Sequence, residues 1–229
     1  MDTVSLCGGR HPLNQDCGCV RQLDQCTVLV LSDGLGSRTH ADRGSALLCD
    51  SVIREAEEQG EGLRDLTPQQ FAEKVHRHWC KAVRPWGIGN CEATLVAVLL
   101  MKESVLMVQM GDGFAAVLAD GVVRVLLDEK RERFLNQTSC FSERFRPEEV
   151  TGLRFPCRKP EGCVLCSDGV EVGDMTAPTV GKFCREFSAG YSGMSREAIR
   201  ADVSRWLEDW PGEDDKTLVY ALPEQEVDR

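Results

Sequence analysis

Four apolar runs follow one another between residues 93 and 127, with only very short polar segments between them. Connections as short as Lys102-Glu103 and Asp120-Gly121 are typical of β-hairpins. Four strands this close together predict an antiparallel meander. Nearly every residue of the runs is apolar, so both faces of the strands should be buried. The runs are ATLVAVLLM (93–101), SVLMVQM (104–110), FAAVLAD (114–120) and VVRVLL (122–127).

The remaining elements are expected to alternate between strands and helix pairs. Gly60 and Gly62 should end the first helix, and Thr67-Pro68 has the chemistry of a helix start. This order predicts an α+β fold with a central antiparallel β-sandwich covered by helices, formed by one domain, residues 1–229. Further strands are expected near 4–7, 17–21, 26–32, 152–155, 163–167 and 216–222, and helices near 42–59, 67–83, 178–188 and 195–209.

Composition and charge exclude several classes of protein. The chain is 42% hydrophobic and 28% charged, which suits a soluble globular domain. No run approaches the roughly 18 apolar residues of a membrane helix, and MDTVSLCGG lacks the pattern of a signal peptide. The net charge of −10 disfavours a nucleic-acid partner. We therefore expect a cytoplasmic protein that binds neither nucleic acid nor membrane, and a monomer.

The 12 cysteines raise the question of disulfides or zinc. A disulfide framework suits small secreted proteins, and structural zinc needs paired knuckles. The only CxxC motif, Cys163 to Cys166, lies in an expected strand, where residues three apart face opposite sides. Most of the thiols are therefore interpreted as small buried residues in a reducing cell. His76 and His78, two apart on a helix, are expected at the surface and not at a shared metal.

Aspartates stand at the ends of apolar, strand-like runs. Any single Asp-Gly pair is first an ordinary turn, as Asp120-Gly121 must be. Several carboxylates that converge from one sheet edge repel one another, however, and need cations between them. The sequence therefore indicates a metal site with oxygen ligands and metal-assisted hydrolysis. The segments are Asn14-Gln15-Asp16, Asp33-Gly34, Gly111-Asp112-Gly113, Ser167-Asp168-Gly169 and Asp214-Asp215.

Taken in order, these segments resemble the motifs of the PPM/PP2C family of metal-dependent protein serine/threonine phosphatases, and most of all its compact bacterial branch. The resemblance extends from residue 9 to residue 219. The matching motifs are Gly9-Arg10-His11 with Asn14-Gln15-Asp16, Asp33-Gly34-Leu35-Gly36, Ala93-Thr94-Leu95, Gly111-Asp112-Gly113, Cys166-Ser167-Asp168-Gly169 and Asp214-Asp215-Lys216-Thr217.

The resemblance implies a four-layer αββα sandwich, with two Mn²⁺ or Mg²⁺ ions at one end. Asp33 would bridge the ions, with the Gly34 carbonyl on one of them, and Asp168 and Asp214 would hold the other. Asp214 is preferred to Asp215 because it lies three residues before Thr217. Asp16 would orient metal-bound waters. A third, weakly held ion would use Asp112 and Asp168.

The chain also departs from the family pattern. His11 stands where relatives often carry a phosphate-binding Arg, and Arg10 lies beside it, so either could grip the phosphate. Gln15 replaces a frequent acid. Leu35 cannot donate a proton, unlike the His of many relatives. The charged stretch 128–149, with Asn136-Gln137-Thr138, corresponds to a flap beside the active site.

Three functions remain open at this stage. The first is hydrolysis of phosphoserine or phosphothreonine in proteins by a metal-bridging hydroxide. The second is a catalytically weak pseudophosphatase that binds a phosphoprotein as a scaffold, which the residues at 11, 15 and 35 would suit. The third is an unrelated metal-dependent hydrolase of small phosphoesters.

Overall fold

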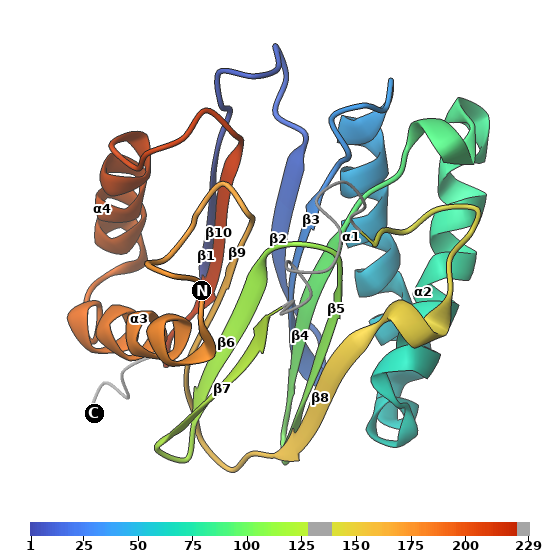
Figure 1. Ribbon diagram of the computed structural model, residues 1–229. Helices are drawn as coiled ribbons and strands as arrows, with labels where there is room; N and C mark the ends of the chain where they lie inside the picture. The colour runs from blue at the N-terminus through green and yellow to red at the C-terminus, as the bar shows by residue number, and fades with distance from the viewer. Residues whose placement is uncertain (128–138, 224–229) are drawn as a thin grey trace.

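Two five-stranded antiparallel sheets pack face to face, and a pair of helices covers each outer face (Figure 1). This arrangement comes from a computed structural model that describes residues 1–127 and 139–223. The expected Asn136-Gln137-Thr138 motif and most of the C-terminal tail lie outside the described residues.

The first sheet has the order β1 (Asp2–Leu6), β10 (Lys216–Ala221), β9 (Pro160–Cys166), β6 (Phe114–Ala119) and β7 (Val122–Leu127). The second sheet has the order β2 (Asp16–Gln22), β3 (Cys26–Asp33), β4 (Leu95–Met101), β5 (Ser104–Met110) and β8 (Thr151–Pro156). Helices α1 (Ala41–Gln59) and α2 (Pro68–Val83) cover the second sheet, whereas α3 (Ala177–Gly190) and α4 (Arg196–Glu208) cover the first.

The apolar runs are continuous because alternate residues of each central strand enter different layers of the core. In β3, Val28 and Val30 pack under α1 and α2, whereas Leu29 and Leu31 pack between the sheets. Side chains of a strand alternate between its two faces, so a strand in the middle of four layers is apolar at most positions on both faces. The α+β fold and the four-layer αββα sandwich are thereby confirmed.

The predicted four-stranded meander is wrong. The runs form two hairpins that lie in different sheets: β4 pairs with β5 in the second sheet, and β6 pairs with β7 in the first. Between them, Gly111 and Gly113 have φ values of 95° and 93°. These left-handed conformations suit glycine, and they send the chain across the sandwich instead of back along β5. The crossing places Asp112 at one end of the sandwich.

Local signals set the helix ends as expected. Thr67 and Gln70 form a reciprocal capping box at the start of α2, and the Ser195 side chain accepts a hydrogen bond from the Ala198 N–H at the start of α4. The cysteines are all free thiols, and Cys163 and Cys166 enter different core layers. Within residues 1–127 and 139–223, none of the helices combines the length and the apolar character that a membrane span requires.

Candidate metal centre and active site

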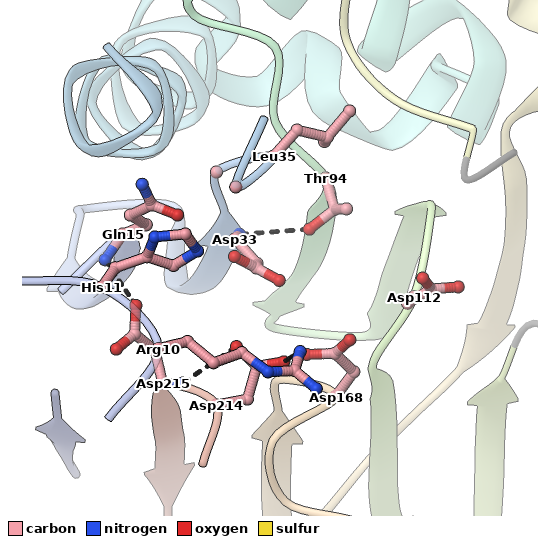
Figure 2. Close-up of a pocket in the computed structure, with 12 residues that line it drawn as sticks. Arg10, His11, Gln15, Asp33, Leu35, Thr94, Asp112, Asp168, Asp214 and Asp215 are labelled. Carbon is pink, nitrogen blue, oxygen red and sulfur yellow. Dashed lines mark hydrogen bonds and ion pairs between the residues drawn. The ribbon is translucent and has the colours of Figure 1, made fainter. Parts of the chain in front are cut away.

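The aspartate-bearing strand ends meet at one end of the sandwich, around a cavity of about 190 Å³ (Figure 2). Asp33 ends β3 of the second sheet, Asp112 lies in the β5–β6 crossing, and Asp168 follows β9 of the first sheet. Asp214 precedes β10. Both sheets therefore supply carboxylates to one pocket. The lining residues are Arg10, His11, Gln15, Asp33, Gly34, Leu35, Gly36, Thr94, Asp112, Asp168, Asp214 and Asp215.

The backbone around Asp33 is held from two sides. The Asp33 N–H donates to Thr94 Oγ1 at 3.1 Å, and the Thr94 N–H donates to the Asp33 carbonyl at 2.7 Å. On the other side, a Cβ on Gly34 would lie 2.4 Å from the carbonyl oxygen of Ala41, the first residue of α1. Only glycine permits so close an approach between this turn and the helix. The Gly34 carbonyl and the Asp33 carboxylate are thus presented on a rigid turn.

The charges of the pocket are crowded. Burial raises the pKa of Asp33 well above its usual range, and the neighbouring carboxylates of Asp16, Asp168 and Asp214 raise it further. An ionised carboxylate is unfavourable both in a poorly solvated site and beside like charges. Divalent cations among these oxygens would remove both penalties.

Asp16 lies opposite Asp33 in the β2–β3 register but is not among the residues that line the pocket. Burial raises its pKa to about 6, even though the nearby Ser167 and Thr217 side chains lower it. Both of its carboxylate oxygens are buried, and neither makes a hydrogen bond of normal geometry with a described residue. Buried carboxylate oxygens normally have partners, so these two can accept hydrogen bonds from bound water.

The two adjacent aspartates before β10 have different roles in the structure. Asp215 is 6% exposed, and its two oxygens accept the N–H groups of Gly8 and Gln15, each at 2.7 Å. Asp214 instead pairs with Arg10, whose Nη1 lies 2.5 Å from Oδ2. Asp215 therefore positions the loop that carries the residues before β2, and Asp214 presents its carboxylate to the pocket.

His11 and Arg10 enter the pocket from that same loop (Figure 2). The His11 ring lies against Gly36, where a Cβ would stand 2.7 Å from Nε2. The Arg10 side chain is 61% exposed and reaches Asp214. Both residues that the sequence left as alternatives for phosphate binding therefore face the pocket.

Sequence reasoning missed two positioning groups. Gln109 is fully buried in β5, and its Nε2 donates to the carbonyls of Gly111 and Gly113, each at 3.0 Å, which shapes the turn around Asp112. The sequence feature that could have identified Gln109 is that it is the one amide side chain in the apolar run SVLMVQM. No local pattern in the sequence predicts that Asp215 accepts the N–H groups of both Gly8 and Gln15, because both partners are about 200 residues away.

The donor set suits hard cations. Carboxylate and carbonyl oxygens are what Mg²⁺ and Mn²⁺ prefer. Among the residues the structure describes, no three carboxylates of this pocket bring their oxygens within 4.8 Å of one another. Water molecules would therefore have to complete the coordination shells, as is usual for Mg²⁺.

Comparison with known proteins gives a family and a fold. The family model described as "Protein phosphatase 2C" matches residues 9–210. Serine/threonine phosphatase Stp1 from Staphylococcus aureus has a similar structure, with a TM-score of 0.66 and 16% identity over 98% of this chain and 94% of that one. RsbX in complex with magnesium gives a TM-score of 0.61 and 16% identity over 95% and 92%.

A third similar structure is the catalytic domain of the serine threonine protein phosphatase PstP, in complex with two manganese ions. Its TM-score is 0.66, with 19% identity over 96% of this chain and 95% of that one. No curated protein sequence matches the chain. The fold is thus shared by chains whose sequences differ at more than four positions in five.

Proposed function

Because the chain belongs to the protein phosphatase 2C family, a family of metal-dependent protein phosphatases, we propose that it hydrolyses phosphoserine and phosphothreonine in proteins with two Mn²⁺ or Mg²⁺ ions bound in the Asp33 pocket. The observation that carries the proposal is the crowding around Asp33. Burial and three neighbouring carboxylates raise its pKa well above the usual range, so ionised carboxylates in this pocket are favoured when cations lie among them.

Specific residues would hold the ions. Asp33 would bridge them, with the Gly34 carbonyl on one. Asp168 and Asp214 would hold the other, and Asp112 with Asp168 would hold a third ion weakly. Asp214 is chosen over Asp215 because Asp215 is buried and holds two backbone N–H groups of the loop before β2. The Oδ2 atom of Asp214 instead meets Arg10, a side chain that is 61% exposed.

When bound, two such ions supply an activated water nucleophile and neutralise phosphate charge. The chain's own groups then orient the reactants. The buried oxygens of Asp16, which make no hydrogen bond of normal geometry with a described residue, would accept hydrogen bonds from water. Arg10 or His11 would bind the phosphate. Leu35 lines the pocket but cannot protonate the leaving oxygen, so that proton must come from another source.

The test is hydrolysis of a phosphoserine or phosphothreonine peptide with and without Mn²⁺, beside p-nitrophenyl phosphate and nucleotides. We expect Mn²⁺-dependent turnover of the peptide that stops on chelation. Turnover of nucleotides without peptides would favour a small-phosphoester hydrolase. A protein that binds the phosphopeptide but neither hydrolyses it nor binds Mn²⁺ in calorimetry would be a pseudophosphatase, which the five carboxylates lining the pocket disfavour.

Replacing Arg10 by Ala should weaken substrate binding and not metal binding. We expect KM for the phosphopeptide to rise roughly tenfold, or ~1.4 kcal/mol, because a charge-assisted contact to phosphate is lost. The Mn²⁺ affinity should hold or improve, because Arg10 no longer competes for Asp214. Steady-state kinetics and calorimetry measure both quantities. If His11→Ala raises KM and Arg10→Ala does not, His11 and not Arg10 binds the phosphate.

The proposal extends to the setting of the protein. We propose one domain over residues 1–229, acting as a monomer in the cytoplasm on phosphoprotein substrates, and binding neither nucleic acid nor membrane. The free thiols support a reducing compartment. The net charge of −10 disfavours phosphate-rich surfaces. Size-exclusion chromatography with light scattering tests the oligomeric state, and a stable dimer would contradict it.

A further inference from the structure

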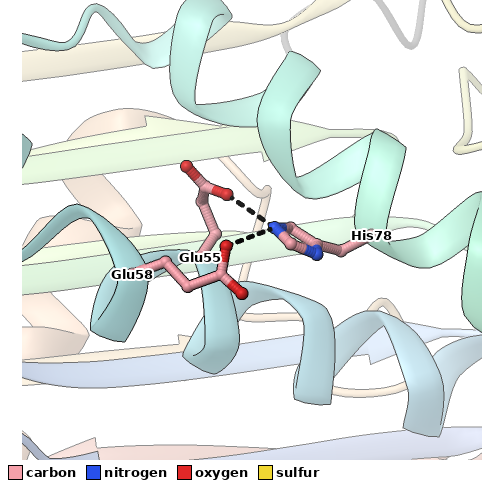
Figure 3. A group of neighbouring side chains, drawn as sticks. All are labelled: Glu55, Glu58 and His78. Atoms are coloured by element: carbon pink, nitrogen blue, oxygen red, sulfur yellow. Dashed lines mark hydrogen bonds and ion pairs between the residues drawn. The ribbon is translucent and has the colours of Figure 1, made fainter.

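A second group of metal-ligating side chains lies between α1 and α2, outside the pocket described above. Glu55 and Glu58 stand three residues apart on α1, and His78 faces them from α2 (Figure 3). His78 Nε2 lies 2.9 Å from Glu55 Oε2 and 3.3 Å from Glu58 Oε2. The expectation that His78 is a surface residue is wrong, because its side chain is only 14% exposed.

In each carboxylate, Oε1 contacts neighbouring side chains and Oε2 faces His78. Oε1 of Glu55 accepts a hydrogen bond from Gln59 at 2.7 Å and lies 3.9 Å from Lys74 Nζ. Oε1 of Glu58 accepts from Arg54 at 2.8 Å. The Oε2 atoms both point to the imidazole. Outer hydrogen bonds of this kind orient carboxylates that ligate a metal.

The protons available do not satisfy this cluster. Nε2 of His78 carries at most one hydrogen, yet two carboxylate oxygens approach it. Glu55 is 2% exposed, so its carboxylate depends on these few partners and not on bulk water. Buried carboxylates are normally fully paired. Three electron-pair donors around one proton are what a cation would satisfy better.

We propose that Glu55 Oε2, Glu58 Oε2 and His78 Nε2 form a second metal site, which takes one Zn²⁺ ion. Atoms about 2.0–2.1 Å from a tetrahedral zinc ion lie about 3.3 Å from one another. His78 Nε2 lies 2.9 and 3.3 Å from the two carboxylate oxygens, and all three ligand atoms lie within 4.8 Å of one another. Imidazole nitrogen and carboxylate oxygen both bind zinc, and water can fill the fourth position on the side where Glu58 is 48% exposed.

This ion would act on the fold and not on the phosphatase chemistry. Glu55 lies 14 residues beyond Ala41, the residue of α1 that packs on Gly34, or about 20 Å along the helix. The ligands come from both helices, so the ion would clamp α1 to α2. Zinc should therefore raise the melting temperature, because a ligand that binds only the folded state stabilises it.

The test uses the full chain with Asp33→Asn and Asp168→Asn, which removes the first metal centre from the measurement. We expect equilibrium dialysis to find one Zn²⁺ per chain, and Co²⁺ in its place to give a visible absorption band. His78→Gln or Glu58→Gln should weaken zinc binding at least about tenfold and abolish the rise in melting temperature. Gln59→Ala, which removes an outer hydrogen bond, should weaken it roughly tenfold.

His40→Gln is the matched control, because His40 lies in the loop before α1, and it should leave zinc binding unchanged. Circular dichroism checks that each variant is folded, and Glu58, which is partly exposed, can be changed with the least risk to folding. Undiminished zinc binding in both His78→Gln and Glu58→Gln, or no zinc bound by the parent, would overturn the proposal. Phosphopeptide hydrolysis by the unmodified chain is a separate measurement, so either proposal can fail alone.

Discussion

Replacing Asp33 by Asn is expected to lower Mn²⁺-dependent hydrolysis of a phosphopeptide at least about a thousandfold, equivalent to ~4 kcal/mol of transition-state stabilisation. Asp33 is the proposed bridge between the two ions, and the Thr94 hydrogen bonds fix its position. An amide has the same shape but no charge, so it cannot serve both cations. The measurement is kcat/KM with saturating Mn²⁺, together with the Mn²⁺ affinity.

The same substitution should stabilise the metal-free protein, which separates loss of a ligand from loss of the fold. The neighbouring carboxylates Asp16, Asp168 and Asp214 disfavour a charge at position 33, and Asn removes that charge. Asp24→Asn is the matched control, because Asp24 is exposed at the turn between β2 and β3 of the same sheet. Mn²⁺-dependent turnover retained in Asp33→Asn would remove the proposed mechanism.

The strands and helices were readable from local patterns. The central strand β4 is apolar at every position and β3 is apolar from Val28 to Leu31, because residues on both faces are buried. Helix starts such as Thr67 and Ser195 are set by side chains within one turn. The assignment of strands to sheets was not readable. It depends on the conformation of Gly111 and Gly113 and on pairing with β8 and β9, which come later in the chain.

The site divides in the same way. Asp33 and Asp112 could be picked out because each follows an apolar run and lies beside glycine, as Asp168 also does. The ion pair between Arg10 and Asp214 and the backbone contacts of Asp215 join segments about 200 residues apart, so no local pattern predicts them. Local sequence thus indicates which groups reach the end of the sandwich. Contacts distant in sequence decide how each of those groups is held there.

The metal-free protein should become more stable, not less, as the pH falls from 8 to 5. The folded-state pKa of Asp16 is about 6, above its ordinary 3.8, and burial and like charges also raise that of Asp33. The native state therefore binds protons that the unfolded chain releases. The stability that this proton uptake adds is fully present below the ordinary pKa of aspartate. It is lost as the pH rises through the pKa of the folded state. Asp16 alone contributes roughly 1.4 kcal/mol between pH 8 and pH 5, or a rise in melting temperature of roughly 3–5 °C.

Two other groups shift the balance in known directions. Burial lowers the pKa of His76 in the folded state. The folded protein therefore loses stability through this residue as the pH falls below the ordinary pKa of histidine, which partly offsets the gain. The pKa of Asp2 is about 2, because the hydrogen bonds from Arg196 and Arg200 outweigh its burial, so its contribution changes only at pH values below the range tested. Asp16→Asn should remove much of the gain, which makes it the control variant.

Saturating Mn²⁺ should reverse the trend. Metal binds the ionised carboxylates, so acid competes with it, and the loaded protein should lose stability from pH 8 to pH 5. Thermal unfolding followed by circular dichroism, with chelator or with Mn²⁺, gives both curves. Parallel curves that fall together toward pH 5 would mean that the charges of Asp16 and Asp33 are not crowded in the folded protein. The electrostatic reason for placing cations in this pocket would then be lost.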